Sequence, residues 1–531
     1  HEWNQWIAML AMKPGEEPTN FERRRDLWLI PGSQKLLTRM LTVEYDRASQ
    51  DTVPLSNAGF TADRNAGEQT LAMRLAAEQC MKERRTLYRG YCDYGTFFMS
   101  VVHNVQWEVE RRCKVLPEVT EVMKALRIGI PERGMPGLSG KYETAAGLTK
   151  AVDILKGLGQ GDLASPVRSK LLLSVMQRAI SKLVRGFKFA GHKERVPLFQ
   201  YADDGCFLTD DLPSLQLAFD ATWVLTRILG LELQVKGKKK TAWSGVYWDG
   251  AQERDVEGYE VKMPDGACMP QLVGKDVYKY LGTELPTGWA NGKAQEITRM
   301  KVRSKCRSLL GMLASIPVLT DQQLGLAMSL AVAGVIGYYG RSTVITWEDC
   351  QRIEAMRADA LRRKGRVPGM PRLQVYATHE QGGMGWHRHA YTYAAAAIID
   401  QFDRNLCTPM GTPGRVAVES AIATTCMQLG LRGLHPLDWH PSHLEKHLRE
   451  EMIVEAWLLA KLRTKLRSRV TEGGRTAPGP MKEMMEGADE MRKRGPELWS
   501  GEYGCEFERT LAAAGVTQWA DISDGKGKWV N

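Results

Sequence analysis

Apolar positions in the first half of the chain change between strand-like and helix-like spacing. Residues 86–94 form a short run rich in aromatic side chains, which is typical of a buried strand. Directly after it, Phe98, Val101, Val105 and Val109 recur at the spacing of one helix face. The pattern predicts a strand that runs straight into an amphipathic helix.

A second helix, a hairpin and a third helix follow. Ser165 and Pro166 form a helix start signal, an N-cap residue followed by proline at the first helical position. Two apolar runs, residues 198–201 and 206–208, flank residues 202–205 (ADDG), whose acidic and glycine residues favour a turn, which predicts a hairpin. The predicted apolar faces are Leu172, Val175, Ala179 and Leu183 in the helix that ends near Gly186, and Leu217, Ala221, Val224 and Ile228 in the helix that stops at Gly230.

The remaining segments are predicted from their composition. Residues 1–77 are polar and arginine-rich, which favours loops with short helices, and the glycine and proline residues of 117–161 favour an irregular connection. Residues 231–235 are predicted to be a strand, 294 to about 466 largely helical, and 471–496 a flexible linker. This alternation predicts an α+β fold around a small, mostly antiparallel sheet.

Composition narrows the class of protein. The 531 residues are 43% hydrophobic and hold 10 cysteines without a CxxC pair, which excludes a disordered tail and a disulfide scaffold and favours reduced thiols in an intracellular protein. The longest uncharged stretch, residues 322–340, contains two glutamines and several glycines, so we expect a buried helix rather than a membrane span. The first residues lack a secretory signal and an initiator Met, and we expect a piece of a longer, non-secreted protein.

Charge points to a polyanionic partner. The chain has 72 Lys+Arg against 62 Asp+Glu, a net charge of +10, and its basic residues gather in local clusters. The clusters are residues 23–25, 236–240, 301–307, 362–366 and 461–469. The alternative for each cluster is a solvated face of a helix or loop.

The pair Asp203 and Asp204 is the sharpest chemical feature. Adjacent carboxylates beside a core strand repel each other, and divalent cations would offset that repulsion. Mg²⁺ prefers oxygen ligands and is usually held by one or two carboxylates plus substrate phosphates. The alternative is a solvated turn; the same dipeptide at Asp210 and Asp211 suggests only a helix N-cap.

A third carboxylate strengthens the metal hypothesis. Asp93 ends the aromatic strand, and we expect this strand to lie next to the hairpin so that Asp93 faces Asp203 and Asp204. Three carboxylates could hold two metal ions about 3.5–4 Å apart, an arrangement that serves phosphoryl transfer.

The order of these motifs resembles the palm of a reverse transcriptase, above all that of non-LTR (LINE-type) retrotransposons. The palm resemblance rests on Asp93, residues 160–166 (QGDLASP), residues 201–204 (YADD) and residues 280–282 (YLG). Further likenesses are residues 13–15 with 21–35 and Gly59-Phe60 with Arg64 (fingers), residues 230–233 with Lys240-Thr241 (after the hairpin), and residues 382–386 (beyond the thumb). The resemblance covers about residues 10–430.

The resemblance implies a right-hand polymerase followed by a largely helical C-terminal region. It places the fingers in residues 1–80, the palm in 81–285 with a fingers insertion at about 114–160, and the thumb in 286–350. A helical connection region would span 351–470, and a flexible linker with a C-terminal segment 471–531.

The resemblance also implies roles for individual residues. Asp93, Asp203 and Asp204 would be the catalytic metal ligands for two Mg²⁺ ions, with Mn²⁺ as an alternative. Phe98 would pack under the deoxyribose and exclude a 2′-hydroxyl, a role compatible with its alternative as a core residue. The other nucleotide-binding residues would be Arg64, Gln160, Gly161 and Lys240, with Lys238 and Lys239 as alternatives to Lys240, and the primer and template grip would be Tyr280, Leu281 and Gly282.

Several positions depart from the family pattern. Met99 stands where the family usually has a second Asp, and Asp63-Arg64-Asn65-Ala66 replaces Gly-Arg-Ser-Thr. Asp162 stands where a small residue is more usual, and we expect it to add negative charge near the pocket. His435, His440, His443 and His447 lie close together in the sequence; a solvent-facing helix is the preferred interpretation and a metal site the alternative.

The predicted function is RNA-directed DNA polymerisation, which the resemblance extends to retrotransposition in the nucleus. The predicted partners are an RNA template, a DNA primer or nicked target DNA, and dNTPs, with no membrane. One alternative is a decayed or domesticated protein that binds RNA without polymerising. The other is an RNA-directed RNA polymerase, against which the aromatic Phe98 argues.

Overall fold

The computed structural model describes most of residues 5–364 and a few segments beyond. The described residues are 5–11, 25–144, 147–235, 240–249, 252–274, 276–287, 292–340, 343, 345–364, 405–406, 408–430, 469–471 and 475–477. The chain forms two compact units. Unit 1 comprises residues 1–66, 84–188 and 193–281, and unit 2 comprises residues 67–83, 189–192 and 282–531.

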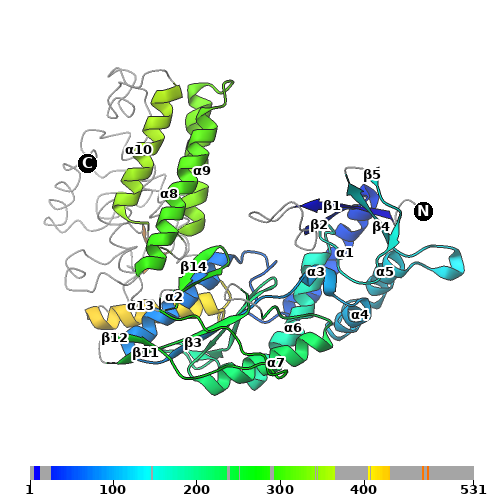
Figure 1. The fold of residues 1–531 in the computed structure, drawn as a ribbon, viewed down its shortest axis with the longest axis horizontal. Coiled ribbons are helices and arrows are strands. Elements are labelled where there is room, and N and C mark those ends of the chain that lie inside the picture. Colours follow the sequence, from blue (N-terminus) through cyan, green and yellow to red (C-terminus); the bar gives the residue numbers. More distant parts are fainter. Residues whose placement is uncertain are drawn as a thin grey trace. The chain divides into compact units, whose positions relative to one another are not determined.

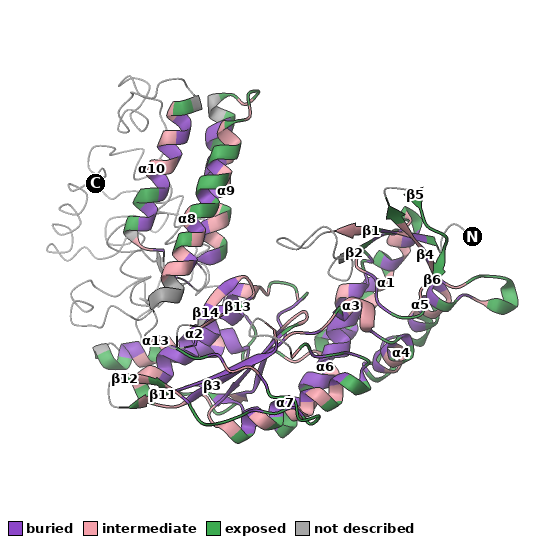
Figure 2. Cartoon of the chain, viewed as in Figure 1, coloured by how far each residue is buried: buried purple, intermediate pink, exposed green. Residues whose placement is uncertain are grey.

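Unit 1 contains a five-stranded antiparallel sheet, the central sheet, of which β3, β11 and β12 are labelled in Figure 1. Its strand order is β12 (Gln252–Asp255), β11 (Ala242–Asp249), β3 (Leu87–Cys92), β10 (Asp204–Thr209) and β9 (Leu198–Tyr201). The central strand β3 is buried almost along its whole length (Figure 2). The predicted aromatic strand, the hairpin and the mixed α+β class with small antiparallel sheets are therefore confirmed.

Helices α6 (Ser165–Leu183) and α7 (Leu212–Ile228) match the two helices predicted around the hairpin. Their buried faces differ from the predicted stripes: Leu183 is 57% exposed, and on α7 Leu217, Val224 and Ile228 are 41%, 46% and 63% exposed. Helix α7 instead buries Leu215, Ala218 and Phe219. The helix is apolar on several sides, so the sheet selects the face: the Phe219 ring meets Phe207 edge-on with ring centroids 5.4 Å apart.

The helix predicted from Phe98 to Val109 is interrupted. Helix α3 (Phe97–Ser100) ends before Val101 and Val102, whose backbone is extended, and α4 (His103–Arg112) begins after them. The Val101 carbonyl accepts a hydrogen bond of 2.7 Å from the Gly157 amide instead of continuing a helix. A loop distant in sequence thus breaks the helix, which periodicity could not reveal.

Two segments predicted as irregular are more ordered than expected. The first 77 residues contain the 21-residue helix α1 (Gly32–Thr52), which buries polar side chains such as Gln34 and Thr38, as well as most of α2 (Ala66–Glu83). Residues 117–161 contain α5 (Pro117–Ile128), the 3₁₀ helix η3 (Pro131–Arg133), and strands β4 (Ser139–Thr144), β5 (Gly147–Leu148) and β6 (Val152–Asp153). Conversely, the strand predicted at 231–235 is only an isolated bridge between Leu233 and Tyr94.

A second sheet in unit 1 contains β1 (Gln5–Ala11), β2 (Arg25–Leu29) and β4. Strand β1 pairs antiparallel with β2 and parallel with β4. Its buried side carries Trp6, Trp28 and Leu138. Unit 1 also contains the short strands β7 (Phe187–Lys188) and β8 (Arg195–Val196), and β13 (Val277–Tyr280).

Unit 2 is largely helical where it is described, as predicted for this part of the chain. It contains α8 (Gly292–Ala314), α9 (Asp321–Tyr339), α10 (Trp347–Lys364), α13 (Pro413–Leu429) and α2, with strands β14 (Thr283–Pro286), β15 (Arg469–Thr471) and β16 (Arg475–Ala477). Helix α9 covers the predicted buried helix but buries only one face, because Leu326 and Leu330 are exposed. No helix in the described ranges is long and apolar enough to cross a membrane.

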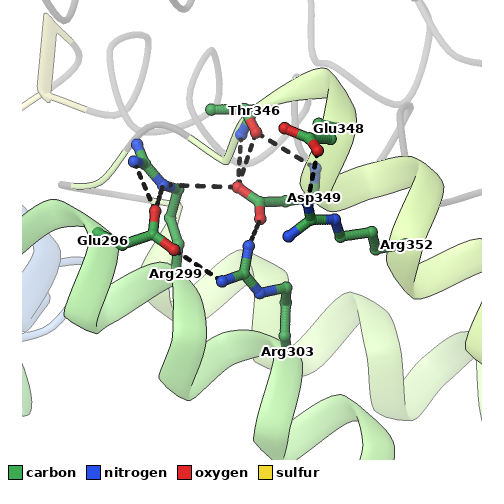
Figure 3. A network of polar contacts seen from close by, with 7 residues as sticks. All are labelled: Glu296, Arg299, Arg303, Thr346, Glu348, Asp349 and Arg352. Carbon is green, nitrogen blue, oxygen red and sulfur yellow. Dashed lines mark hydrogen bonds and ion pairs between the residues drawn. The ribbon is translucent and has the colours of Figure 1, made fainter.

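An ionic network joins α8 to the start of α10 (Figure 3). Asp349 accepts a hydrogen bond of 2.5 Å from Arg303, which also donates to Glu296 at 2.7 Å. Lys301, in the same basic cluster, lies 3.2 Å from Glu284. Two cations of residues 301–307 are thus paired within the protein, so this cluster offers a polyanion less charge than the sequence suggests.

Several predictions lie wholly outside the described residues. They concern the motif at 13–15, the lysines at 238 and 239, the segment 382–386, and the histidines at 435, 440, 443 and 447.

Gly90 tests the packing of α7 on β3. A Cβ atom at Gly90 would lie 2.6 Å from the Phe219 ring, so Gly90→Ala should lower the free energy of unfolding by about 1–3 kcal/mol through overpacking. The control is Gly32→Ala in the same unit, where a Cβ meets nothing within 4 Å. Urea unfolding of both variants measures the difference, and equal midpoints would contradict the packing model.

Candidate active site

The β3–β10 register brings the three predicted carboxylates to one edge of the central sheet. Gly205 lies opposite Cys92 in this antiparallel ladder, so the next position sets Asp204 opposite Asp93. Asp203 occupies the turn that joins β9 to β10, because Tyr201 pairs with Asp204. The carboxylates thus come from two neighbouring strands and the hairpin turn.

The turn is held in a conformation that is unusual for its sequence. Ala202 has a φ of 53°, in the left-handed region that favours glycine in tight hairpins. The Gln200 side chain donates a hydrogen bond of 2.8 Å to the Ala202 carbonyl. Gly59 abuts the turn so closely that a Cβ atom there would lie 2.1 Å from the Ala202 nitrogen. Backbone bonds from Ala58 to Gln200 and from Gln200 to Ser56, both 3.0 Å, fix this approach.

Asp93 is anchored through its backbone, which leaves its side chain available. Its amide donates to the Thr241 hydroxyl at 3.1 Å, and its carbonyl accepts from the Gln234 amide at 2.9 Å. Lys240 Nζ lies 3.0 Å from Asp93 Oδ2 as an ion pair, without the alignment of a hydrogen bond. Lys240, the described member of the predicted lysine group, therefore contacts a carboxylate of the site.

The carboxylates perturb one another. Although Asp204 is an exposed residue, desolvation of its carboxyl group, followed by the charges of Asp203 and Asp93, raises the pKa of Asp204 to about 7, and Lys279 opposes this shift. The Tyr278 ring stacks on Tyr91 with centroids 3.9 Å apart. Burial, followed by the charge of Asp93, raises the pKa of Tyr278 above its usual range.

The carboxylates do not form a preformed metal cage. Within the described ranges, no three His, Cys, Asp or Glu side chains lie close enough to hold one ion. Asp93 Oδ2 is nevertheless a buried oxygen with no hydrogen-bond partner among the described residues. Hard oxygen donors that repel one another, one of them held by an ion pair without a hydrogen bond, fit Mg²⁺, which takes one or two carboxylates and completes its shell with phosphates and water. The residues therefore fit an ion that is bound together with a phosphate ligand.

Gln160 and Gly161 lie in a loop, residues 157–161, that contacts two elements. The Gln160 carbonyl accepts from the Trp28 amide of β2 at 2.8 Å. Gly161 has a φ of 124°, and a Cβ there would lie 2.3 Å from the Trp28 carbonyl oxygen, so only glycine fits. At the other end, the Leu158 amide donates to the Phe98 carbonyl at 2.7 Å. The loop is thus attached to α3, which follows Asp93 in the chain.

Phe98 and Arg64 have local roles in this structure. Phe98 is half-buried against the main core and meets Phe97 edge-on at 5.4 Å, which agrees with the core alternative and leaves part of the ring exposed. Arg64 donates to the Leu55 carbonyl at 2.9 Å within the loop that contains Gly59.

The predicted grip residues surround a turn. Tyr280 ends β13 and is buried, with its ring centroid 6.2 Å from that of Tyr91. Leu281 and Gly282 have φ values of 46° and 75°, so the chain reverses at these two residues. Tyr280 therefore belongs, with Tyr91 and Tyr278, to a group of buried tyrosine rings.

The expectation for Asp162 was wrong. Its carboxylate is buried and forms an ion pair of 2.7 Å with Arg127, so it adds no net negative charge. Sequence reasoning also missed Thr241 as an anchor, although it noted the Lys240-Thr241 motif, and missed Lys279. Alternation along β13 could have suggested that Lys279 faces away from the buried Tyr278 and Tyr280.

Comparisons with known proteins give distant structural similarities only. No family model and no curated protein matches the chain. A Candida albicans telomerase in complex with the TWJ fragment of telomeric RNA matches with a TM-score of 0.34 and 10% identity over 76% of this chain and 63% of that one. The corresponding Candida tropicalis complex gives 0.36, 11%, 79% and 64%, and apo Candida tropicalis telomerase gives 0.37, 10%, 79% and 68%. The match thus spans less than two thirds of the first two chains, and no functional conclusion follows from similarity this low.

The raised pKa of Asp204 predicts a pH-dependent cost to stability. Between about pH 4 and pH 7 the unfolded chain has lost this proton while the folded chain keeps it, so the metal-free protein loses stability as the pH rises through this window. Asp204→Asn should therefore raise the melting temperature more at pH 8 than at pH 5, measured in EDTA.

Asp211→Asn is the control for this measurement. Asp211 caps α7 through a bond of 2.8 Å from the Ser214 amide, as the sequence suggested, and asparagine caps equally well. An equal gain at both pH values for Asp204→Asn would refute the assigned pKa.

Proposed function

We propose that the chain is an RNA-directed DNA polymerase that extends a primer 3′-end on an RNA template. The observation that carries the proposal is the register that sets Asp204 opposite Asp93, with Asp203 in the adjoining turn. Carboxylates gathered at a sheet edge suit phosphoryl transfer, in which catalysis depends on positioning and on charge stabilisation. The motif order in the sequence supports a nucleotide as the reacting partner.

In this proposal the chain's residues bind and orient the reactants. Asp93, Asp203 and Asp204 hold Mg²⁺, which when bound would supply electrophilic stabilisation of the reacting phosphate. Thr241 and Gln234 fix the Asp93 backbone, and Gln200 and Gly59 fix the turn that carries Asp203.

Lys240 and the remaining nucleotide-binding residues complete the proposed pocket. Lys240, whose ammonium lies 3.0 Å from Asp93 without a directed hydrogen bond, would move from Asp93 to the β- and γ-phosphates of the bound nucleotide, which leave as pyrophosphate. Gln160 and Gly161 line the template and nucleotide pocket, Arg64 binds the triphosphate, and Tyr280 to Gly282 contact the primer. Phe98 presents its exposed edge to the sugar.

The wider biological role follows from the sequence resemblance alone. We propose retrotransposition of the LINE type in the nucleus, with nicked target DNA as the primer and the fingers, palm and thumb boundaries given above.

A second candidate function is RNA binding without polymerisation. It is favoured by the ion pair that neutralises Asp93 and by the lack of three converging ligands in the described part of the chain. The two functions differ in one property, the ability to form a phosphodiester bond.

Primer extension tests the choice between them. The purified chain with an RNA template, an annealed DNA primer, dNTPs and Mg²⁺ should extend the primer, and EDTA should abolish the extension. The Asp203→Asn/Asp204→Asn double variant should lose at least about 10³-fold in rate, because charge stabilisation at the reacting phosphate is lost. Asp211→Asn should extend like the wild type. Salt-dependent duplex binding by all variants with no extension by the wild type would support the second candidate.

Phe98→Ala tests the choice of sugar. Loss of the ring should open space for a 2′-hydroxyl, so the ratio of ribonucleotide to deoxyribonucleotide kcat/KM should rise at least about tenfold, a barrier difference near 1.4 kcal/mol. The control is Phe97→Leu, because Phe97 is buried in the core beside Phe98. An unchanged ratio in Phe98→Ala would remove Phe98 from this role.

A further inference from the structure

The loop of residues 157–161 joins two parts of unit 1. One end is tied to α3 by the bond from Leu158 to Phe98, and to Val101 just after α3 by the bond from Gly157, each 2.7 Å. The other end is tied to β2 by the bond from Trp28 to Gln160 at 2.8 Å. The loop therefore links the segment around α3, which follows Asp93 in the chain, to β2 of the β1–β2–β4 sheet.

A buried arginine forms hydrogen bonds near both ends of the loop. Arg127, near the end of α5, donates through Nη2 to the Leu158 carbonyl at 2.8 Å and to Asp162 Oδ2 at 2.7 Å. Its guanidinium also lies over the Trp6 ring of β1, 4.5 Å from the centroid. One side chain thus contacts the loop, the residue that follows the loop, and the neighbouring sheet.

The surroundings of this ion pair are tight. The side chains of Arg127 and Asp162 are each 1% exposed. A Cβ at Gly159 would lie 2.5 Å from the same Trp6 ring. The Asp162 Oδ1 atom accepts from the Ala164 amide at 3.2 Å at the start of α6. Rotation of the Asp162 side chain would break bonds at both of its oxygens, so the pair has one arrangement.

Stability alone explains this pair poorly. Burial of two charges is costly, and well-packed apolar residues of similar volume often serve as well or better. Arg127 Nη1 has no hydrogen-bond partner among the described residues, which adds a desolvation cost. Unlike apolar packing, the pair forms directional hydrogen bonds. These bonds end on the Leu158 carbonyl oxygen and on the Asp162 carboxylate.

We propose that Arg127, paired with Asp162, is a positioning residue that fixes the 157–161 loop and thereby the Gln160–Gly161 nucleotide pocket. The nucleotide part of this inference rests on the proposed polymerase function. Arg127 itself touches neither the carboxylates nor substrate; it acts through the Leu158 carbonyl and the Asp162 carboxylate.

Asp162→Asn is the test variant, and Glu110→Gln is its matched control. Glu110 forms a second buried arginine pair in unit 1, 2.7 Å from Arg168, with side chains 0% and 1% exposed. Both substitutions change a buried carboxylate beside an arginine into an amide, but Glu110 bonds to none of residues 157–161. The full chain is assayed for single-nucleotide incorporation, each variant at the same interval below its own melting temperature.

The expected result is a split between KM and kcat. Asp162→Asn should raise KM for the complementary dNTP about tenfold while kcat stays within about threefold of wild type, since a misplaced pocket weakens nucleotide binding. Glu110→Gln should leave both constants within about threefold. Equal changes in the two variants would mean a general loss of stability and would overturn the proposal.

A second measurement does not need polymerase activity. Hydrogen exchange should accelerate at the amides of Gly157, Leu158 and Trp28 in Asp162→Asn but not in Glu110→Gln. Unchanged exchange at these amides would overturn the positioning role of Arg127, whatever the polymerase assay shows. If the wild type never extends a primer, the proposed function and the nucleotide role are both overturned. Hydrogen exchange alone then decides whether Arg127 and Asp162 fix the 157–161 loop.

Ser165→Ala is a milder variant in case Asp162→Asn does not fold. The Ser165 hydroxyl also donates to the Leu158 carbonyl, so its removal takes away one of two side-chain donors without leaving an unpaired charge. We expect a rise in KM of about fivefold, above the range allowed for Glu110→Gln, and faster exchange at Leu158. A wild-type KM together with wild-type exchange at Leu158 would count against the positioning role of Arg127.

Discussion

The antiparallel ladder between β3 and β10 is the constraint on which the candidate site depends. Backbone hydrogen bonds fix which residues face each other, and here they set Asp204 opposite Asp93. A slip of one residue would turn each side chain to the other face of the sheet. The register is held by packing beneath it, where Gly90 admits the Phe219 ring and Phe207 meets that ring edge-on. Core packing and site geometry are thus parts of one arrangement.

Close backbone approaches transmit this arrangement to the surrounding loops. Gly59 lies against the hairpin turn at Ala202, and Gly161 lies against the Trp28 carbonyl. Each approach leaves no room for a Cβ atom, so neither loop can shift without moving the element it contacts. The Arg127–Asp162 pair adds a hydrogen bond from Arg127 to the Leu158 carbonyl, in the loop that contains Gly161. The loops that carry Gly59 and Gly161, which lie far apart in the sequence, are thereby each held against another element of unit 1.

Electrostatics set the chemical character of the site. Desolvation of the Asp204 carboxyl group, followed by the charges of Asp203 and Asp93, raises the pKa of Asp204. Lys279 opposes this shift, and Lys240 forms an ion pair with Asp93. Away from the edge, charges are paired inside the protein, as Asp162 is with Arg127 and Asp349 with Arg303. Asp93, Asp203 and Asp204 differ from these isolated pairs, because three carboxylates lie near one sheet edge and Lys240 pairs with Asp93.

The sequence by itself determined the α+β class, the aromatic strand and the hairpin, because strand propensity and turn chemistry are local properties. It also singled out Asp93, Asp203 and Asp204. The tertiary structure alone decided which face of α7 is buried, where the helix after Phe98 breaks, and that Asp162 is neutralised. Each of these depends on a partner far along the chain: Phe219 packs where Gly90 leaves space, Gly157 takes the Val101 carbonyl, and Arg127 lies 35 residues from Asp162. Periodicity reports that a face is apolar, but only packing selects its partner.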